Sequence, residues 1–123
     1  IMQNYFGVFR RGDYMKKGIH KLNDLKARVE NVHLEDKSSA FNTARIEALE
    51  LQNLFETAYA TAVAAEGRTE SRGAHAREDF QERDDDNWLC HSIYMPGERE
   101  IGKRAVNMTL KTMKPFEPKV RTY

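Results

Sequence analysis

Charged and imidazole side chains alternate with small residues between residues 70 and 77. The segment reads Glu70-Ser71-Arg72-Gly73-Ala74-His75-Ala76-Arg77. Small neighbours let a backbone approach another surface closely, while the long basic side chains between them reach outward. The pattern therefore indicates a segment that contacts a partner. The alternative is a disordered surface loop, which the composition alone favours.

Two further clusters contain residue types that bind metals. Asp84, Asp85 and Asp86 follow one another, but a calcium loop needs carboxylates at alternating positions, a glycine and a final glutamate. Cys90 and His91 are neighbours in a predicted strand, so their side chains point to opposite faces. No second cysteine completes a zinc site. We predict no metal site here, only solvated charges.

The patterns typical of catalytic and cofactor sites are missing from the sequence. It contains no arrangement of nucleophile and base, no paired-carboxylate cleft and no glycine-rich phosphate loop. In particular, no G-x-G-x-x-G follows a predicted strand. We therefore predict no catalytic residue and no cofactor-binding residue in this chain.

Apolar residues at helical spacing predict the elements that position the 70–77 segment. A second helix follows Asp13, with a stripe formed by Met15, Ile19, Leu22, Leu25, Val29 and Val32. A third helix covers residues 43–66, begins at the cap Asn42 and places Phe55 in its core. Phe41 and Ile46 have the spacing of a hydrophobic staple at its start.

Residues 1–9 carry apolar and aromatic side chains at helical spacing and predict the last turns of a first helix. Arg10, Arg11 and Gly12 are suited to end it, because cations and glycine favour helix carboxyl termini. Asp13 then caps the second helix. These elements predict a mainly α fold, an antiparallel three-helix bundle with a truncated first helix.

The chain after Gly67 changes character. Residues 67–87 are polar, and alternating apolar residues then predict a β-hairpin with strands near 88–95 and 104–110. An extended tail contains Pro115 and Pro118. We expect one domain divided into a helical bundle, a polar docking loop, and a hairpin with tail, at residues 1–66, 67–87 and 88–123.

Composition limits the classes of protein that the chain can represent. Its 123 residues are 40% hydrophobic, and 20 basic residues nearly balance 19 acidic ones. This balance gives no electrostatic footprint for nucleic acid. The single cysteine favours a reducing compartment. Since Ile1 begins directly in an apolar stretch, we expect the chain to be a piece of a longer protein.

Two stretches strongly resemble the flavoprotein subunits of succinate dehydrogenases and fumarate reductases. The first runs Arg68-Thr69-Glu70-Ser71-Arg72-Gly73-Ala74-His75-Ala76-Arg77-Glu78-Asp79-Phe80 and continues to Arg83-Asp84-Asp85. The second comprises Asn87-Trp88-Leu89-Cys90-His91-Ser92 and the closing Val120-Arg121-Thr122-Tyr123, and resembles bacterial succinate dehydrogenases. L-Aspartate oxidase shares the Glu-Ser-Arg-Gly segment but is less similar in the tail.

The resemblance implies that the chain is the carboxy-terminal helical domain of such a subunit. A complete subunit also has a flavin-binding and a capping domain. It oxidises succinate to fumarate and passes electrons through FAD to an iron–sulfur subunit and on to quinone. The complex, with its membrane anchor subunits, lies at the cytoplasmic face of the bacterial inner membrane. The family's flavin-linking, catalytic and dicarboxylate-binding positions have no counterparts in this chain.

The resemblance also implies that the 70–77 segment packs on the flavin-binding domain. The expected docking residues are Glu70, Ser71, Arg72, Gly73, His75 and Arg77. Arginines there are suited to bidentate pairing with carboxylates. In this chain by itself the partner is missing, so we expect a mobile loop and a solvated Arg72.

Two other functions fit the sequence. The chain could be the same domain of a fumarate reductase or an L-aspartate oxidase flavoprotein. It could also be a free-standing helical interaction module that binds through the polar loop.

Overall fold

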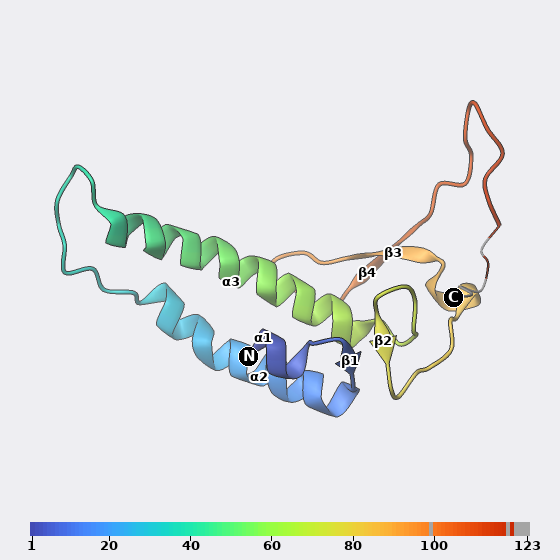
Figure 1. Cartoon of the computed structure of the whole chain (residues 1–123), viewed down its shortest axis with the longest axis horizontal. Helices are drawn as coiled ribbons and strands as arrows, with labels where there is room; N and C mark the ends of the chain where they lie inside the picture. The colour runs from blue at the N-terminus through green and yellow to red at the C-terminus, as the bar shows by residue number, and fades with distance from the viewer. Residues whose placement is uncertain (99, 118, 120–123) are drawn as a thin grey trace.

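The computed structural model describes residues 1–98, 100–117 and 119. Two long helices dominate it: α2, Gly12–Glu30, and α3, Thr43–Gly67, run antiparallel beside each other (Figure 1). A single-turn helix α1, Met2–Tyr5, packs on α2. The mainly helical fold predicted from the sequence is confirmed. No helix among these residues is long and apolar enough to cross a membrane.

The core lies between the helices and follows the predicted stripe of α2 as far as Val29; Val32 lies beyond the end of α2 and is 40% exposed. Met15, Leu22 and Val29 are buried on one face of α2, because positions seven apart are separated by about two helical turns. They belong to the same buried cluster as Phe6 of the segment after α1 and three residues of α3: Phe55, Ala62 and Ala65. The prediction that Phe55 is a core residue is confirmed, since only 6% of it is exposed.

The first ten residues differ from the prediction. The helix ends at Tyr5, and strand β1, Phe9–Arg10, pairs in parallel with β2, Ala76–Arg77. Gly12 does not end the first helix. It opens α2, whose amino-terminal cap is Arg11, so the predicted cap Asp13 is wrong. Pairing with a strand far along the sequence overrides the local helical pattern of residues 6–9.

Asn42 caps α3 as predicted, since its side-chain oxygen accepts a hydrogen bond from the Arg45 amide at 2.8 Å. The predicted staple does not form. Phe41 has a positive φ of 53° and is fully exposed, and Ile46 is 55% exposed. The left-handed backbone at Phe41 leads the loop away from the helix, so the two side chains do not cover each other.

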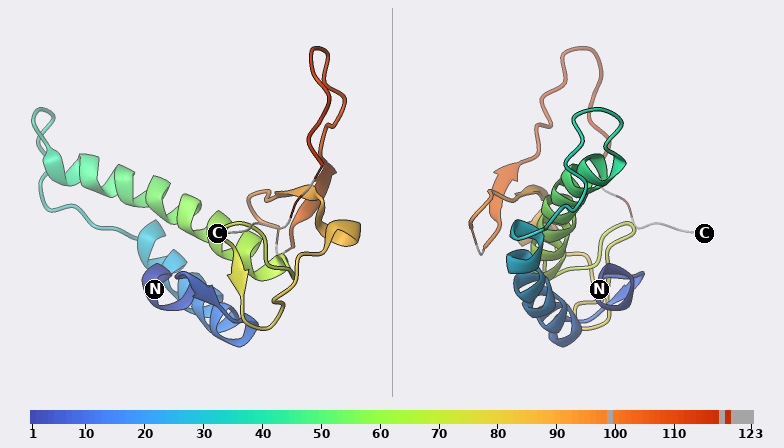
Figure 2. Two further views of the ribbon diagram at one scale, coloured as in Figure 1. Left: turned by 45° about the vertical axis from the view of Figure 1, so that its right-hand side comes forward. Right: turned by 90° about the vertical axis from the view of Figure 1, so that its left-hand side faces the viewer.

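The predicted hairpin is present but shorter than expected. A single turn, α4 at Asp85–Trp88, precedes β3, Cys90–Ile93, which pairs antiparallel with β4, Gly102–Ala105. After β4 the chain extends away from the helices (Figure 2). Pro118 and residues 120–123 of the predicted tail lie outside the described residues.

Candidate functional site

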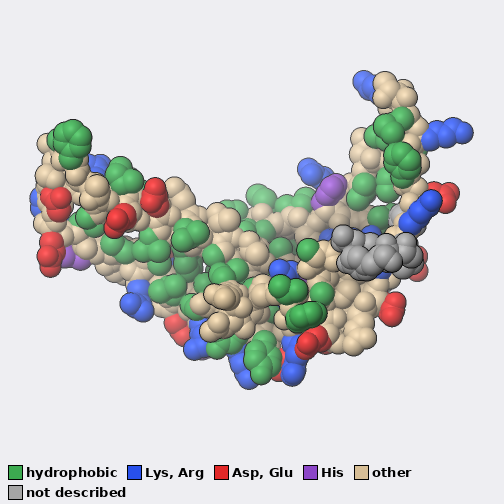
Figure 3. Space-filling view, in the orientation of Figure 1, with side chains coloured by type: hydrophobic (Ala, Val, Ile, Leu, Met, Phe, Trp, Pro, Cys, Tyr) green, Lys and Arg blue, Asp and Glu red, His purple; other side chains and the backbone are tan. Residues whose placement is uncertain are grey.

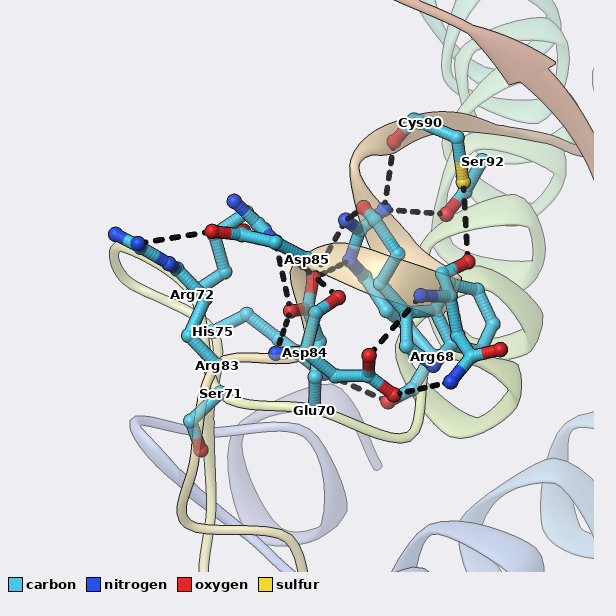
Figure 4. Close-up of polar contacts among 12 residues, drawn as sticks. Arg68, Glu70, Ser71, Arg72, His75, Arg83, Asp84, Asp85, Cys90 and Ser92 are labelled. Atoms are coloured by element: carbon cyan, nitrogen blue, oxygen red, sulfur yellow. Dashed lines mark hydrogen bonds and ion pairs between the residues drawn. The ribbon is translucent and has the colours of Figure 1, made fainter. Parts of the chain in front are cut away.

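The polar loop, residues 67–87, is folded around a buried carboxylate. Glu70 has no exposed surface, and its Oε1 accepts hydrogen bonds from Arg68 Nε at 2.8 Å and Arg72 Nε at 2.7 Å (Figure 4). Its Oε2 accepts from the Asp84 amide at 2.9 Å. Two cations and an amide thus compensate the burial of one negative charge.

The electrostatics of this cluster favour the ionised carboxylate. Burial by itself would raise the pKa of Glu70. The hydrogen bonds from Arg72, from the Asp84 amide and from Arg68 outweigh burial, so the pKa lies below its ordinary value. Glu70 is therefore a fixed negative charge at neutral pH.

Arg72 has its partners within the chain. Beside Glu70 it pairs with Asp85, its Nη2 lying 2.6 Å from Oδ1, and Arg83 holds the other oxygen of Asp85 at 2.9 Å. Only 27% of the Arg72 side chain is exposed. The expectation of a solvated Arg72 in a mobile loop is therefore wrong. The carboxylates that satisfy it lie two and thirteen residues away in the same chain.

Arg68 was not among the residues predicted from the sequence, yet it connects the loop to the hairpin. It donates hydrogen bonds to the carbonyls of Trp88 and Cys90 and to Ser92 Oγ. Its guanidinium also lies over the Trp88 ring, 5.3 Å from the ring centre, which is within the roughly 6 Å of a cation–π contact. The sequence gives no signal for this role, because the acceptors lie in a distant segment and two of the three there are backbone carbonyls.

Arg77 binds the carboxyl end of α3, and Asp79 binds the amino end of α2. Because the two helices are antiparallel, these two termini lie at the same end of the pair (Figure 1). The buried Arg77 donates to the carbonyls of Ala65 and Glu66, at 3.3 and 2.9 Å, where α3 ends. Asp79 accepts from the Gly12 amide at 2.9 Å, where α2 begins. Each charge suits the helix end that it binds. Arg77 and Asp79 also pair with each other at 2.7 Å, and this bond holds the pKa of Asp79 well below its ordinary value.

His75 lies between β1 and the end of α3. Its Nδ1 is 2.7 Å from Arg10 Nη1, and its Nε2 is 3.0 Å from the Arg68 carbonyl. A guanidinium only donates and a carbonyl only accepts, so Nδ1 carries the lone pair and Nε2 the proton. His75 is neutral in this arrangement. Burial lowers its pKa, and the charges of nearby arginines, Arg10 first, lower it further.

The remaining predicted docking residues shape the turn. Ser71 donates to the Phe80 carbonyl and accepts from the Arg77 amide, both at 2.8 Å. The backbones of Arg72 and His75 bond each other across the turn. Gly73 lies at the tip with φ of 59° and open space around it. The structure thus brings five of the six residues into one bonded loop and leaves Gly73 exposed.

The acidic side chains of the described residues form no metal cluster, and two of them line a hollow on α3. No group of three or more histidine, cysteine or acidic side chains among them could hold a metal. Asp84 instead caps α4 by accepting from the Asn87 amide at 3.0 Å. An open hollow of about 610 Å³ on α3 is lined by Glu47 and Glu50, whose carboxylates would repel a pyrophosphate. That hollow therefore does not suit the pyrophosphate of FAD.

Comparison with known proteins identifies the family. The family model described as fumarate reductase flavoprotein C-term matches residues 1–123. The succinate dehydrogenase flavoprotein subunit of Coxiella burnetii is 54% identical over 98% of this chain, and that of Rickettsia bellii is 36% identical over 99%. The match covers only 20% of the Coxiella subunit's length.

Solved structures give the same result. A chain of the E. coli quinol fumarate reductase is 35% identical and superposes with a TM-score of 0.81, covering 94% of this chain and 20% of its own. The Mycobacterium smegmatis Sdh1 complex contains a chain that is 29% identical, with a TM-score of 0.67 and 94% coverage of this chain. The chain belongs to the succinate dehydrogenase and fumarate reductase flavoprotein family and corresponds to the carboxy-terminal domain of its members.

Proposed function

We propose that this domain belongs to a succinate dehydrogenase flavoprotein subunit and serves it structurally. The whole subunit oxidises succinate to fumarate and passes electrons through FAD to an iron–sulfur subunit and on to quinone. Flavin and substrate bind outside this chain, and the complex lies at the cytoplasmic face of a bacterial inner membrane with its anchor subunits. The observation that carries the proposal is the 54% identity to the Coxiella subunit along 98% of the chain.

The polar loop is the part that we propose to face the flavin-binding domain. Glu70, Arg72 and Arg77 are occupied by partners within the chain, so their task is to fix the loop's shape. The exposed tip at Gly73 and Ala74 is then held in one conformation and can meet a partner without a further ordering cost. The division into residues 1–66, 67–87 and 88–123 is part of the same proposal.

A chimera tests the parent activity. In the C. burnetii subunit, the 120 matched residues are replaced by this chain. The chimera is expected to co-purify with flavin and to reduce a dye with succinate, as the native subunit does. The subunit without the matched residues is the control. A folded chimera that holds no flavin, or that gains nothing over this control, contradicts the proposal.

Substitution at the tip tests the docking role. Ala74→Arg places a long charged side chain on the exposed turn, and so is expected to weaken flavin retention in the chimera. The unfolding temperature of the chain alone should not change, because the site is exposed. Equal behaviour of both chimeras excludes the tip from the contact.

A fumarate reductase is the second candidate, because the Haemophilus influenzae fumarate reductase flavoprotein subunit is 39% identical over 76% of the chain. The lower identity and coverage favour the succinate dehydrogenase. Comparing the chimera's rates of succinate oxidation and fumarate reduction cannot separate the two, since the chemistry lies outside this chain. Reading the gene upstream of this chain separates them and also excludes the free-standing module.

A further inference from the structure

An apolar patch lies open beside β1, and nothing in the polar loop explains it. Phe9 and Phe80, here called the β1 patch, are exposed by 76% and 43%. Hydrophobic side chains are visible at the surface in the lower middle of Figure 3, where Figure 1 places β1. Single exposed apolar residues are ordinary, but a group of them marks an interaction surface.

The patch borders an open hollow of about 300 Å³. The hollow is lined by Phe9, Ser71, Ala76, Arg77, Glu78 and Gln81. Phe80 joins the patch through Arg77, whose guanidinium lies 5.0 Å from the centre of the Phe80 ring. Ser71 and Arg77 are already held by hydrogen bonds within the chain, so the walls of the hollow are fixed.

A further chain segment could also form hydrogen bonds with the backbone beside the patch. β1 and β2 form a parallel sheet of two strands, two residues each. Ser71 Oγ bonds the amide and the carbonyl of Arg77 on the outer side of β2, so among the described residues it is β1 that keeps an open edge. Parallel sheets occur almost only where both faces are covered, and so small a sheet is marginal in water. An extended segment can add to such an edge while its apolar side chains enter a neighbouring hollow.

We propose that the β1 patch is covered by an extended, apolar segment from the remaining four-fifths of the flavoprotein subunit. This inference rests on the proposed function. Two aromatic side chains and an open hollow of about 300 Å³ are too small for a free partner, which needs an interface of about 1,200 Å² or more. A segment tethered to the same subunit binds at high effective concentration and can use a smaller contact. The size of the patch therefore favours the subunit's own polypeptide over a second copy of this chain.

The six phenylalanines of the chain differ in exposure, so their labelling rates serve as internal references for the test. Hydroxyl-radical labelling of the chain alone should be slow at the buried Phe6 and Phe55 and fast at Phe9, Phe80, Phe41 and Phe116. In the chimera with the C. burnetii subunit, labelling of Phe9 and Phe80 is expected to fall to the rate of Phe6 and Phe55. Phe41, fully exposed at the far end of the helices, should stay fast.

The two proposals fail in distinguishable ways. A chimera that holds flavin and oxidises succinate, but labels Phe9 and Phe80 as fast as the chain alone, overturns the β1 patch and leaves the proposed function standing. Slow labelling of both residues in a dimer of the chain alone assigns the patch to a second copy and also overturns the inference. Loss of flavin and activity in the folded chimera overturns the proposed function itself.

A pair of variants provides a second measurement. Phe9→Thr keeps a β-branched residue in the strand but removes the ring, and is expected to lower the temperature at which the chimera releases flavin. It should leave the unfolding temperature of the chain alone unchanged. Phe41→Asn, which tolerates the positive φ, is the matched control and should change neither. A Phe9→Thr chimera that behaves like this control overturns the inference.

Discussion

At the scale of single residues, the polar loop is organised by charges removed from water. Glu70 lies fully buried between Arg68 and Arg72, and the buried Arg77 holds Asp79. Such groups cost little while they remain paired, but the loss of one partner leaves the other charged and desolvated. The loop should therefore respond far more strongly to neutral substitutions inside it than to substitutions on its surface.

Glu70→Gln tests this directly. The amide keeps the size of the side chain but leaves two guanidinium groups facing a neutral group, so the free energy of unfolding should fall by about 3–5 kcal/mol. Urea titration of the chain measures it. Glu30→Gln, at the exposed pair with Lys26, is the control and should cost less than about 1 kcal/mol. A loss below about 1 kcal/mol for Glu70→Gln would show that the cluster is not coupled as described.

His75 makes stability depend on pH. Its pKa is lowered from 6.5 in the folded chain. Just below pH 6.5, His75 therefore binds a proton in the unfolded chain but stays neutral in the folded chain. The stabilisation is complete above pH 6.5 and is lost as the pH falls toward the folded-state pKa, by up to about 1.4 kcal/mol per pH unit.

Comparing urea titrations at about pH 7.5 and about pH 5.5 measures this loss. His75→Gln, which does not titrate, should show a smaller loss than the unmodified chain. His33→Gln, at an exposed position, should keep the loss unchanged. Identical losses in all three proteins would place the proton uptake on other groups.

At the scale of the elements, the sequence predicts well the features that depend on local, repeated spacing. It predicts poorly the features that depend on a single contact between residues far apart in the sequence. The stripe of α2 and the cap Asn42 of α3 were predicted because helical periodicity and capping are local. Strand β1 was missed, since two residues show no alternation and Phe9 pairs with Ala76 across most of the chain. The staple failed at Phe41 because one left-handed residue redirects the chain.

The same contrast applies to the polar loop. Its six docking residues were recognised as a group, yet the sequence could not show that Glu70 and Arg77 point inward. Glu70 is bonded by Arg68 and Arg72, each two positions away, but the spacing of charges in a loop does not show which side chain is buried. Arg77 in addition binds backbone carbonyls of α3, which the spacing of side chains does not reveal. Arg68 was overlooked for the same reason.

Gly18 lets α1 and the turn after it pack closely on α2. A Cβ built at Gly18 would lie 2.6 Å from Tyr5 Cβ and 2.5 Å from the Phe6 ring. Alanine would gain about 1 kcal/mol from helix propensity, but such overpacking costs about 1–3 kcal/mol. Gly18→Ala should therefore lower the free energy of unfolding, or at best leave it unchanged.

Urea titration measures whether Gly18→Ala lowers or raises the free energy of unfolding. Asp24→Ala, at an exposed position of the same helix, is the control and should be neutral or stabilising. A clear stabilisation by Gly18→Ala would mean that α1 is not seated on α2 as described.

At the scale of the whole molecule, the two ends of the helix pair differ. At one end the polar loop and hairpin cover α3, while at the other Phe41, Ile46 and Leu54 remain exposed. The hollow on α3 beside Leu54 has an acidic lining, with Glu47 and Glu50. Under the proposed structural role, the chemistry takes place in another part of the subunit.

The purified chain should accordingly be colourless and inactive. After incubation with FAD and gel filtration, we expect no visible flavin absorbance and no succinate-dependent reduction of a dye. The reason is the missing dinucleotide motif together with the acidic lining at Glu47 and Glu50. The chimera serves as the positive control. Flavin bound at one equivalent per chain would contradict the assignment of a purely structural role.

The bond between Asp79 and the first amide of α2 joins residues 67 positions apart. During synthesis, α2 leaves the ribosome before Asp79 has been made. The carbonyls at the end of α3 likewise lack their donor until Arg77 has been made. The helix pair can therefore be completed only late, when a segment made afterwards returns to the end where α2 begins and α3 ends. A chain released between residues 67 and 77 would carry both long helices with one end of each unsatisfied, and would be a natural target for proteolysis.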